Sequence, residues 1–346
     1  MDKNLFNKLK FETIESLITN TCASISMRTQ EEISKNILYE NEKQKYIDKI
    51  LANEKIKVIS SWQMPDGYFG TRLHTPPSKS KIWSHEGCVR YLIEMGIPIN
   101  NLLLKKSLDV LLTDGWEKEF IGSKAGQAFD GSNIIRASLF SQAGIHEHEF
   151  LQYYIEKSLM PFEIVANANG YNDIAVPYKD KYIYKEGKWL PEIYAFRTLA
   201  FTFNWRTKNN MSMLLTAYDN LYKWLPFPPT YIKIGSQLVA PGGHIQLALN
   251  NDFSEVIGFT WFDFYELSAR MGVLTTKSPF YKHFKNLFEK VLETKGNIFK
   301  DIDKKGFVNW SSYSGLALED DWVKKQRKIN DLVFRCCLID SIINNY

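Results

Sequence analysis

The sequence predicts an all-α fold built of helical hairpins. Three observations support this prediction: apolar residues recur at helical spacing in one segment after another, strand-like alternation is scarce, and glycines close several of the periodic segments. The 346 residues, 45% of them hydrophobic, are enough to bury one large helical core. We therefore expect a single domain over residues 1–346, with residues 1–40 forming a helical segment packed on it.

The expected helices follow in chain order. Apolar positions three and four residues apart lie within residues 11–18, 47–62, 89–93, 103–112, 135–143, 150–155, 211–222 and 280–291, and a last helix is expected from about Val323 to Ile343. Gly96, Gly144 and Gly272 each follow a periodic segment, where a left-handed residue ends a helix. Two stretches, from about Ala166 to Pro191 and from Pro226 to Phe253, break the pattern with proline, glycine and tyrosine. We expect long loops or short hairpins there.

A turn pattern recurs between the expected helices. An acid or amide precedes a glycine and an aromatic residue at Asp66-Gly67-Tyr68, Asp114-Gly115-Trp116 and Asn169-Gly170-Tyr171. The three glycines are about 50 residues apart, a period that suits one helical hairpin with its loops and is typical of repeat architectures. The spacing therefore favours a helical repeat.

Composition and charge exclude several classes of protein. The net charge of +4 arises from 43 basic and 39 acidic residues that are well mixed, so we expect no nucleic-acid partner. No apolar run reaches the roughly 18 residues that span a bilayer, and acids interrupt the N-terminal apolar stretch, so neither a transmembrane segment nor a signal peptide is expected. The four cysteines lack zinc spacing and do not suggest a disulfide framework, which predicts a cytoplasmic location.

The run "VISSWQMPDGYF", residues 58–69, has a hydrophobic pair, then Gln63, then Gly67 and an aromatic residue at position 69. It resembles the glutamine-tryptophan repeat of squalene and oxidosqualene cyclases, with Phe69 in the place of tryptophan. The segments "HEGCVRYLIEMGIP", "NIIRASLFSQAGI" and "INDLVFRCCLIDSII" are similar to short bacterial prenyltransferase-like and squalene-cyclase-like proteins, and the resemblance extends from about residue 43 to 343.

This resemblance implies an α/α toroid of the α6/α6 type, in which the repeat's glutamine ties helix ends together as scaffold. It also implies an isoprenoid-handling enzyme, related to terpene cyclases and prenyltransferases, with an aromatic-lined central cavity for a small hydrophobic or isoprenoid ligand. Because related toroids often work beside a second domain, a partner protein or domain is compatible with the resemblance.

The same resemblance makes two acidic clusters candidate catalytic residues. Asp301 and Asp303 are the nearest match to the cyclase motif Asp-any-Asp-Asp, but a lysine occupies the last acid position, and a cation there weakens the acid as a proton donor. Asp320 and Asp321 match the start of the magnesium-binding motif Asp-Asp-any-any-Asp, whose final acid is missing. A solvated turn explains the first cluster without chemistry, and an acidic helix N-terminus explains the second.

The candidate substrate-binding residues are aromatic, charged or hydrogen-bonding side chains near the expected helix entries: His74, Trp83, His85, Glu86, Trp116, Asp130, Arg136, Arg197, Trp310 and Trp322. His85 and Glu86 also fit the first turn of a helix that Ser84 caps. Both interpretations of this turn stay open at the level of sequence.

Two arginines have an acid nearby in sequence. Asp130 with Arg136, and Glu192 with Arg197, fit either buried ion pairs or a site for an anionic group such as diphosphate, which planar guanidinium groups bind well. No metal ligand is assigned. Magnesium is expected only if the substrate carries a diphosphate, zinc is not expected, and other cofactors are unknown.

Two other functions stay open beside the isoprenoid enzyme. One is a non-catalytic toroid that binds a ligand or a partner. The other is a carbohydrate-active enzyme on a similar α/α barrel, in which two carboxylates act as acid and base on a glycosidic bond.

Overall fold

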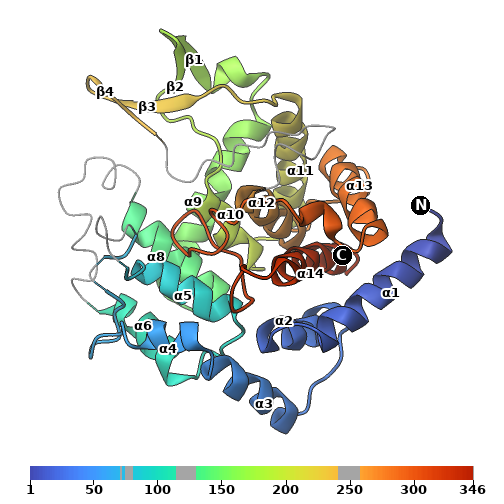
Figure 1. Cartoon of the computed structure of the whole chain (residues 1–346). Helices are drawn as coiled ribbons and strands as arrows, with labels where there is room; N and C mark the ends of the chain where they lie inside the picture. The colour runs from blue at the N-terminus through green and yellow to red at the C-terminus, as the bar shows by residue number, and fades with distance from the viewer. Residues whose placement is uncertain (71, 75–80, 114–129, 241–257, 346) are drawn as a thin grey trace. The chain divides into compact units, whose positions relative to one another are not determined.

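A computed structural model of the protein describes residues 1–70, 72–74, 81–113, 130–240 and 258–345. These residues are mostly helical, as expected, and they also contain a four-stranded mixed sheet (Figure 1), which corrects the expectation of an all-α fold. The chain divides into two compact units: unit 1 comprises Met1–Trp116, Ile257–Glu266 and Lys282–Tyr346, and unit 2 comprises Glu117–Val256 and Leu267–Tyr281. The single domain expected over residues 1–346 stays a prediction.

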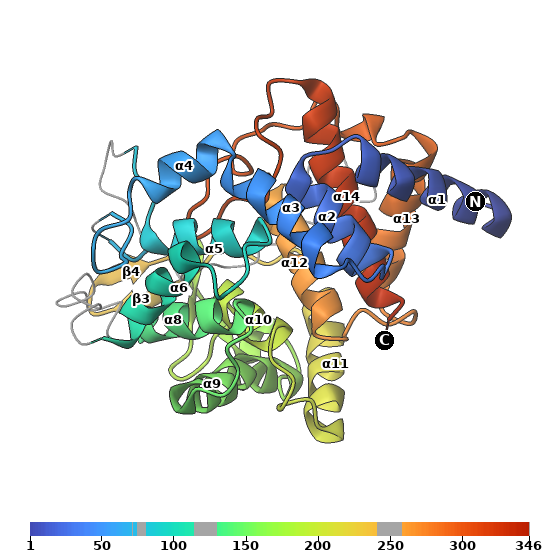
Figure 2. The same ribbon diagram turned by 90° about the horizontal axis from the view of Figure 1, so that it is seen from below.

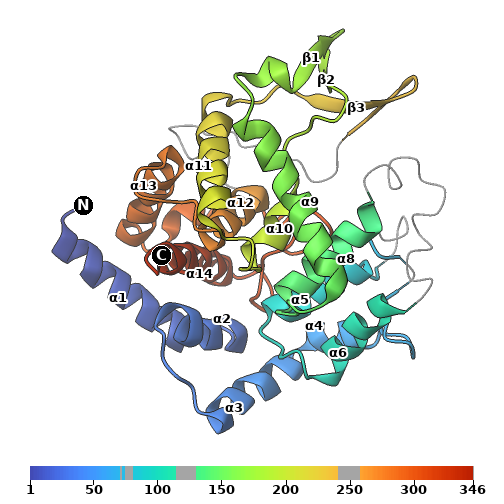
Figure 3. The same ribbon diagram turned by 180° about the vertical axis from the view of Figure 1, so that it is seen from behind.

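Unit 1 is helical in its described residues. It contains α1 (Lys3–Thr19), α2 (Ala23–Arg28), a π-helical turn (Thr29–Ile33), α3 (Glu40–Leu51), α4 (Glu54–Ser60), α5 (His85–Glu94), α6 (Leu102–Asp109), 3-10 turns at Val110–Leu112 and Asn297–Phe299, α14 (Lys325–Ile343), the first part of α12 (Phe259–Arg270) and most of α13 (Pro279–Glu293). Figures 2 and 3 show α1 and α2 beside α13 and α14. Lys10 of α1 forms an ion pair with Asp340 of α14, and the Phe6 ring meets Phe288 edge-on at 5.8 Å. The N-terminal helix therefore packs on α13 and α14 within unit 1.

Arg335 of α14 is the centre of a buried ion network. Its Nη1 lies 2.8 Å from Oε2 of Glu94 and 3.1 Å from Oε2 of Glu266, and its Nη2 donates to the carbonyl of Leu316 at 2.9 Å. Arg28 of α2 contacts the same Glu94 oxygen at 2.8 Å. Burial alone would lower the pKa of Arg335, but Glu94 and Glu266 raise it above its usual value. A buried charge without its partner raises the free energy of the folded chain. The network therefore holds α2, α5, α12 and α14 in contact.

The helices expected from apolar spacing are present, except that the segment expected over residues 47–62 forms two helices, α3 and α4, because Asn53 caps a new helix. The other differences are at helix ends. Helix α14, for example, begins at Lys325 and not at about Val323. Gly96, Gly144 and Gly272 have φ angles of +81°, +79° and +76°, the left-handed conformation expected for helix ends.

Unit 2 combines helices with the sheet. It contains α8 (Gly131–Gln142), α9 (Glu149–Ala166), a 3-10 turn (Tyr171–Asp173), β1 (Ala175–Tyr178), β2 (Lys181–Tyr184), α10 (Ile193–Ala200), α11 (Lys208–Lys223), β3 (Thr230–Ile234), β4 (Gln237–Val239) and the ends of α12 and α13. Helix α10 is buried along its whole length and packs against α8 and α9.

The sheet consists of two short antiparallel hairpins, in the two stretches where loops or hairpins were expected. Strands β1 and β2 turn at Lys179 and Asp180, with Lys179 at a φ of +57°, and β3 and β4 turn beside Gly235, at a φ of +60°. Parallel pairing of β2 with β3, with Tyr182 opposite Thr230, joins the hairpins into one sheet in the order β1-β2-β3-β4.

We predict that Arg335→Met destabilises the protein by about 3–5 kcal/mol, because it removes the buried cation that the carboxylates of Glu94 and Glu266 share. Chemical denaturation measures the change. The matched control is Arg327→Met on the same helix, where the guanidinium pairs with Asp321 and is 28% exposed, so its loss should cost less than about 1 kcal/mol. Equal effects of the two substitutions would contradict the central position of Arg335.

Candidate functional site

Helix α5 places two neighbouring side chains in the interior of unit 1. Ser84 caps the helix as expected, because its Oγ accepts a hydrogen bond from the N–H of Gly87 at 3.2 Å. His85 and Glu86 follow, and both are fully buried. Adjacent residues of a helix do not face each other, so the two side chains serve different partners.

His85 is a structural histidine, which corrects its expected part in substrate binding. Its Nδ1 accepts from the N–H of Phe69 at 3.0 Å, and its Nε2 lies 2.9 Å from the carbonyl of Ser107, to which it donates. The imidazole stacks on Tyr68 with the ring centroids 4.1 Å apart. Burial lowers the pKa of His85 to about 4, so the ring is neutral near pH 7. Both of its nitrogens are used within the scaffold.

Glu86 instead reaches His74, which precedes the helix. Oε2 of Glu86 lies 3.0 Å from Nδ1 of His74. The Glu86 side chain is 0% exposed and that of His74 is 18% exposed, so the pair runs from the interior to an accessible ring. The two residues were expected in one site, and the structure brings them into direct contact.

A turn far along the chain completes the cluster with two hydroxyl groups. The Tyr313 hydroxyl lies 3.2 Å from Nε2 of His74. The Ser312 hydroxyl donates to the carbonyl of His74 at 2.7 Å, and its oxygen also lies 2.9 Å from Nδ1. Sequence analysis did not identify either residue, because more than 230 positions separate them from His74.

Arg90 holds this turn on α5. Its Nη1 donates to the carbonyl of Ser311 at 2.5 Å and also approaches those of Ser312 and Ser314, at 3.4 and 3.3 Å. Gly315, at a φ of +100°, lets the turn fold over Trp310, since a Cβ there would lie 2.4 Å from the ring. Glu86 and Arg90 are four residues apart and so share one face of α5, which presents the acid and anchors the hydroxyls.

These contacts assign a role to each atom of the cluster. The Ser312 proton is used on a carbonyl, so the Nδ1–H of His74 is the donor toward the Glu86 carboxylate. Nε2 is then the basic nitrogen, and it accepts from the Tyr313 hydroxyl. An acid that orients a base, and a base that contacts a hydroxyl, form the arrangement by which proteins activate hydroxyl groups.

The two tryptophans near this cluster pack against the ring of Tyr91, and Trp83 does so from a half-buried position. Tyr91 is fully buried, with ring centroids 5.6 Å from Trp83 and 5.3 Å from Trp310, both at steep angles. Trp310 is 1% exposed, and the Lys55 ammonium lies 4.4 Å from the Tyr91 ring centroid. Burial lowers the pKa of Lys55 to about 8. Trp310 therefore packs the site from behind and does not face a substrate.

The four aspartates expected as catalytic residues lie in exposed turns. The Asp301 side chain is 83% exposed beside Lys300, and Asp303 accepts from the N–H of Lys305. Asp320 accepts from Asn53, and Asp321 accepts from the backbone before α14 and pairs with Arg327. The hydrogen bond from the N–H of Val323 is the main cause that lowers the pKa of Asp321. None of the four contacts the His74 cluster in the described residues.

Trp322 leads to a buried acid that sequence analysis missed. Its indole N–H donates to Oδ2 of Asp331 at 2.6 Å, and Asp331 also accepts from the backbone N–H groups of Leu318 and Glu319. Burial raises the pKa of Asp331 to about 6, and burial together with Asp331 raises the pKa of Glu319 to about 7. Asp331 lies in the largely apolar run "INDLVFRCC", where an acid among apolar residues was the available signal.

The expected ion pairs of unit 2 are replaced by other contacts. Asp130 accepts from the Tyr154 hydroxyl at 2.5 Å and pairs with Lys157 at 3.4 Å, and Arg136 lies over the Phe150 ring at 4.1 Å. Hydrogen bonds from Tyr154 and Asn133 lower the pKa of Asp130 against the opposing effect of burial.

Arg197 is buried with its guanidinium 5.6 Å from the Tyr194 ring centroid, and no ion pair joins it to Glu192. Trp116, also expected to bind substrate, lies outside the described residues.

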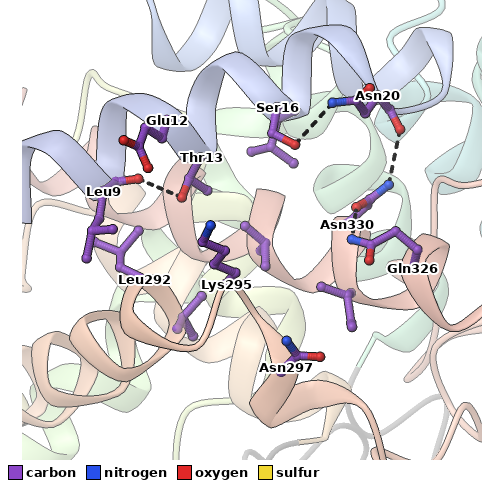
Figure 4. A pocket seen from close by; sticks show the side chains of 14 residues that line it. Leu9, Glu12, Thr13, Ser16, Asn20, Leu292, Lys295, Asn297, Gln326 and Asn330 are labelled. Carbon is purple, nitrogen blue, oxygen red and sulfur yellow. Dashed lines mark hydrogen bonds between the residues drawn. The ribbon is translucent and has the colours of Figure 1, made fainter.

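A cavity of about 510 Å³ lies elsewhere in unit 1. Helices α1, α13 and α14 line it with aliphatic side chains, amides and short polar groups (Figure 4). Glu12 and Lys295 also line it, but no ion pair joins them in the described residues. Asn20, Asn330 and Gln326 are hydrogen-bonded within this wall, Asn330 to the carbonyl of Asn20 and Gln326 to Asn330. The wall therefore offers no acid–base pair like that of His74 and Glu86.

We predict that His85 makes the protein less stable in acid. The pKa of His85 is about 4 in the folded chain and about 6.5 in the unfolded chain. The unfolded chain therefore binds a proton first, and the free energy of unfolding falls as the pH drops from 6.5 toward 4. The loss amounts to roughly 3 kcal/mol. His85→Gln should therefore flatten the curve of unfolding free energy against pH over this interval, relative to the exposed control His146→Gln. The same slope in both variants would contradict the buried neutral ring.

No family model matches this chain, and no curated protein or solved structure is similar to it. Among the described residues, no group of three or more acids, histidines or cysteines is arranged to hold a metal ion, and no helix there is long and apolar enough to cross a membrane.

Proposed function

We propose that unit 1 carries an acid–base catalytic site in which His74 is the base, Glu86 orients it and Tyr313 faces the substrate. The observation that carries this proposal is the order of the contacts, with a buried acid on one ring nitrogen and a hydroxyl on the other. The exposed part of the His74 ring and the half-buried Tyr313 are the groups that a substrate would reach.

The relay moves two protons. As a substrate hydroxyl gives its proton to the phenolic oxygen of Tyr313, the phenol gives its own proton to Nε2 of His74. The substrate oxygen becomes a nucleophile, and the positive charge that forms on the imidazole is stabilised by Glu86. The Nδ1–H donates to Glu86 before and after the transfer, so the ring need not turn. In reverse, the relay protonates a departing oxygen.

The surroundings favour a polar substrate that carries hydroxyl groups. Ser311 and Ser314 are half-buried and lie on the same turn as Ser312 and Tyr313. The nearest large rings, Tyr91 and Trp310, are buried in packing contacts and are not free to line an apolar cavity. Transfer or hydrolysis at a hydroxyl-bearing compound therefore fits this site better than chemistry on a hydrocarbon.

Cyclisation of an isoprenoid or prenyl transfer, which the sequence resemblance implies, stays a prediction, as does the α/α toroid. Gln63 supports a scaffold role for the repeat-like run, since its side-chain amide donates to the carbonyls of Gly67 and Leu103 at 3.1 and 2.8 Å. A carbohydrate substrate is consistent with the polar site proposed above. The non-catalytic alternative remains the competing account.

We predict that His74→Gln lowers kcat by about 10²–10⁴-fold with little change in KM, because general acid–base catalysis contributes roughly that factor. The assay is a panel of nitrophenyl esters, nitrophenyl glycosides, oligosaccharides and prenyl diphosphates, measured first with the unmodified protein. Tyr313→Phe should lower kcat similarly, and Glu86→Gln should lower it because the ring loses its orienting partner.

His146→Gln is the matched control, since His146 is exposed and lies in unit 2. Added imidazole should restore part of the activity of His74→Gly, an effect that a purely structural role would not give. Turnover of no compound by the unmodified protein, or equal rates for it and His74→Gln, would overturn the proposal in favour of a non-catalytic protein.

A further inference from the structure

Unit 2 contains a small cavity of about 140 Å³ that the proposed reaction does not use. Helices α8, α9 and α10 and the segment before α10 line it with Ile134, Lys157, Ser158, Pro161, Trp189, Glu192, Tyr194 and Ala195. Glu192 supplies a carboxyl group to this wall, and Trp189 and Tyr194 supply two rings. The Tyr194 ring also contacts the Arg197 guanidinium, 5.6 Å from its centroid. The Ser158 hydroxyl donates to the carbonyl of Tyr154.

The carboxyl group of Glu192 has no hydrogen-bond or ion-pair partner in the described residues. Glu192 is the residue before α10, but its side chain does not cap that helix. Burial raises the pKa of Glu192 to about 7, and neither Lys157 nor Arg197 offsets this effect. A carboxylate in such a place is unstable unless a cation joins it.

The charged groups around the cavity are directed elsewhere. The Lys157 ammonium lies 3.4 Å from Asp130 and 5.1 Å from the Tyr153 ring centroid, and Arg197 lies over Tyr194. Arg136 on α8 lies over Phe150, and on β2 the buried hydroxyl of Tyr184 is close enough to Glu192 for the two to interact. Glu192 is therefore the acidic group that a ligand in the cavity would meet, beside a lysine whose ammonium is paired with Asp130.

We propose that this cavity binds a small organic ammonium ion, held by the carboxylate of Glu192 against the rings of Trp189 and Tyr194. A carboxylate supplies the opposite charge, and aromatic faces attract alkylated ammonium groups. A dry cavity of about 150 Å³ holds benzene, so the ligand here is limited to about that size. An ammonium headgroup with short alkyl substituents fits both limits.

Binding of the cation is linked to ionisation of Glu192. Below pH 7 the carboxyl group must lose its proton for the ion to bind, so the complex releases close to one proton per ligand at pH 6 and few at pH 8. The apparent affinity should rise about tenfold between these two pH values, because the ionised fraction rises by that factor.

Isothermal titration calorimetry with tetramethylammonium tests the proposal on the full chain. Its neutral counterpart of similar size, tert-butanol, shows whether the charge matters, and buffers of different ionisation enthalpy measure the released proton. We expect saturable binding of tetramethylammonium only, tighter at pH 8. No saturable binding, or equal binding of tert-butanol, would overturn the proposal.

Two variants locate the site. Glu192→Gln keeps the shape of the side chain and should weaken binding at least tenfold at pH 8, while Trp189→Phe keeps a ring and should retain most of it. Glu163→Gln, at an exposed position on α9, is the matched control. The amide in Glu192→Gln carries no buried charge, so this variant should unfold at a higher temperature than the unmodified protein at pH 8. Weaker binding by such a stable variant would then reflect the lost carboxylate and not a folding defect. Unchanged affinity in Glu192→Gln would exclude this cavity.

Discussion

The interior of unit 1 depends on buried guanidinium groups whose hydrogen bonds are used on carboxylates and carbonyls. Arg335 binds Glu94 at the end of α5 and the carbonyl of Leu316, and Arg90 within α5 binds the carbonyls of the turn just before Leu316. The two arginines thus hold the segment from 311 to 316 along the helix that presents Glu86. Such groups are costly to bury, so each is stable only where its partners are in place. The position of Tyr313 relative to His74 follows from this constraint.

The stretch from residue 60 to residue 86 has two different roles. Its first part forms a corner of the scaffold, in which Gln63 connects the turn at Gly67 to α6 and Phe69 is fully buried. Its last part presents Glu86, which meets His74 and its hydroxyl partners. His85, which is structural, and Glu86, which orients His74, are adjacent in sequence. They differ in role because their side chains leave α5 in different directions.

Sequence reasoning identified the features that local physics determines. The Ser84 cap, the left-handed glycines and the amphipathic helices depend on neighbouring residues, and they were correctly predicted. Helices α10 and α12 received no bounds from the sequence: Gly272 indicated the end of α12, and the residues before Arg197 indicated a helix entry at α10. Both helices are buried almost throughout, so few exposed polar positions mark their extent.

The parallel pairing of β2 with β3 and the contact of His74 with Tyr313 join residues far apart in the chain, and no local pattern encodes either. His74 and Glu86 were identified from sequence because they follow the turn at Gly67, on the side where the resemblance places an active face. The expected pairs of Asp130 with Arg136 and of Glu192 with Arg197 are not formed in the structure. Each acid is close to an arginine in sequence, but Asp130 forms its ion pair with Lys157. The guanidinium groups of Arg136 and Arg197 lie over the rings of Phe150 and Tyr194.

The most direct test of the relay is the protonation state of the two rings, measured by long-range ¹H–¹⁵N correlation spectra of the histidine side chains near pH 8. The hydrogen bonds require the proton of neutral His74 on Nδ1, toward Glu86, and that of His85 on Nε2, toward Ser107. Spectra with these two opposite tautomers, and a His74 signal that changes in Glu86→Gln, would support the account. A proton on Nε2 of His74 would leave no basic nitrogen facing Tyr313 and would contradict it.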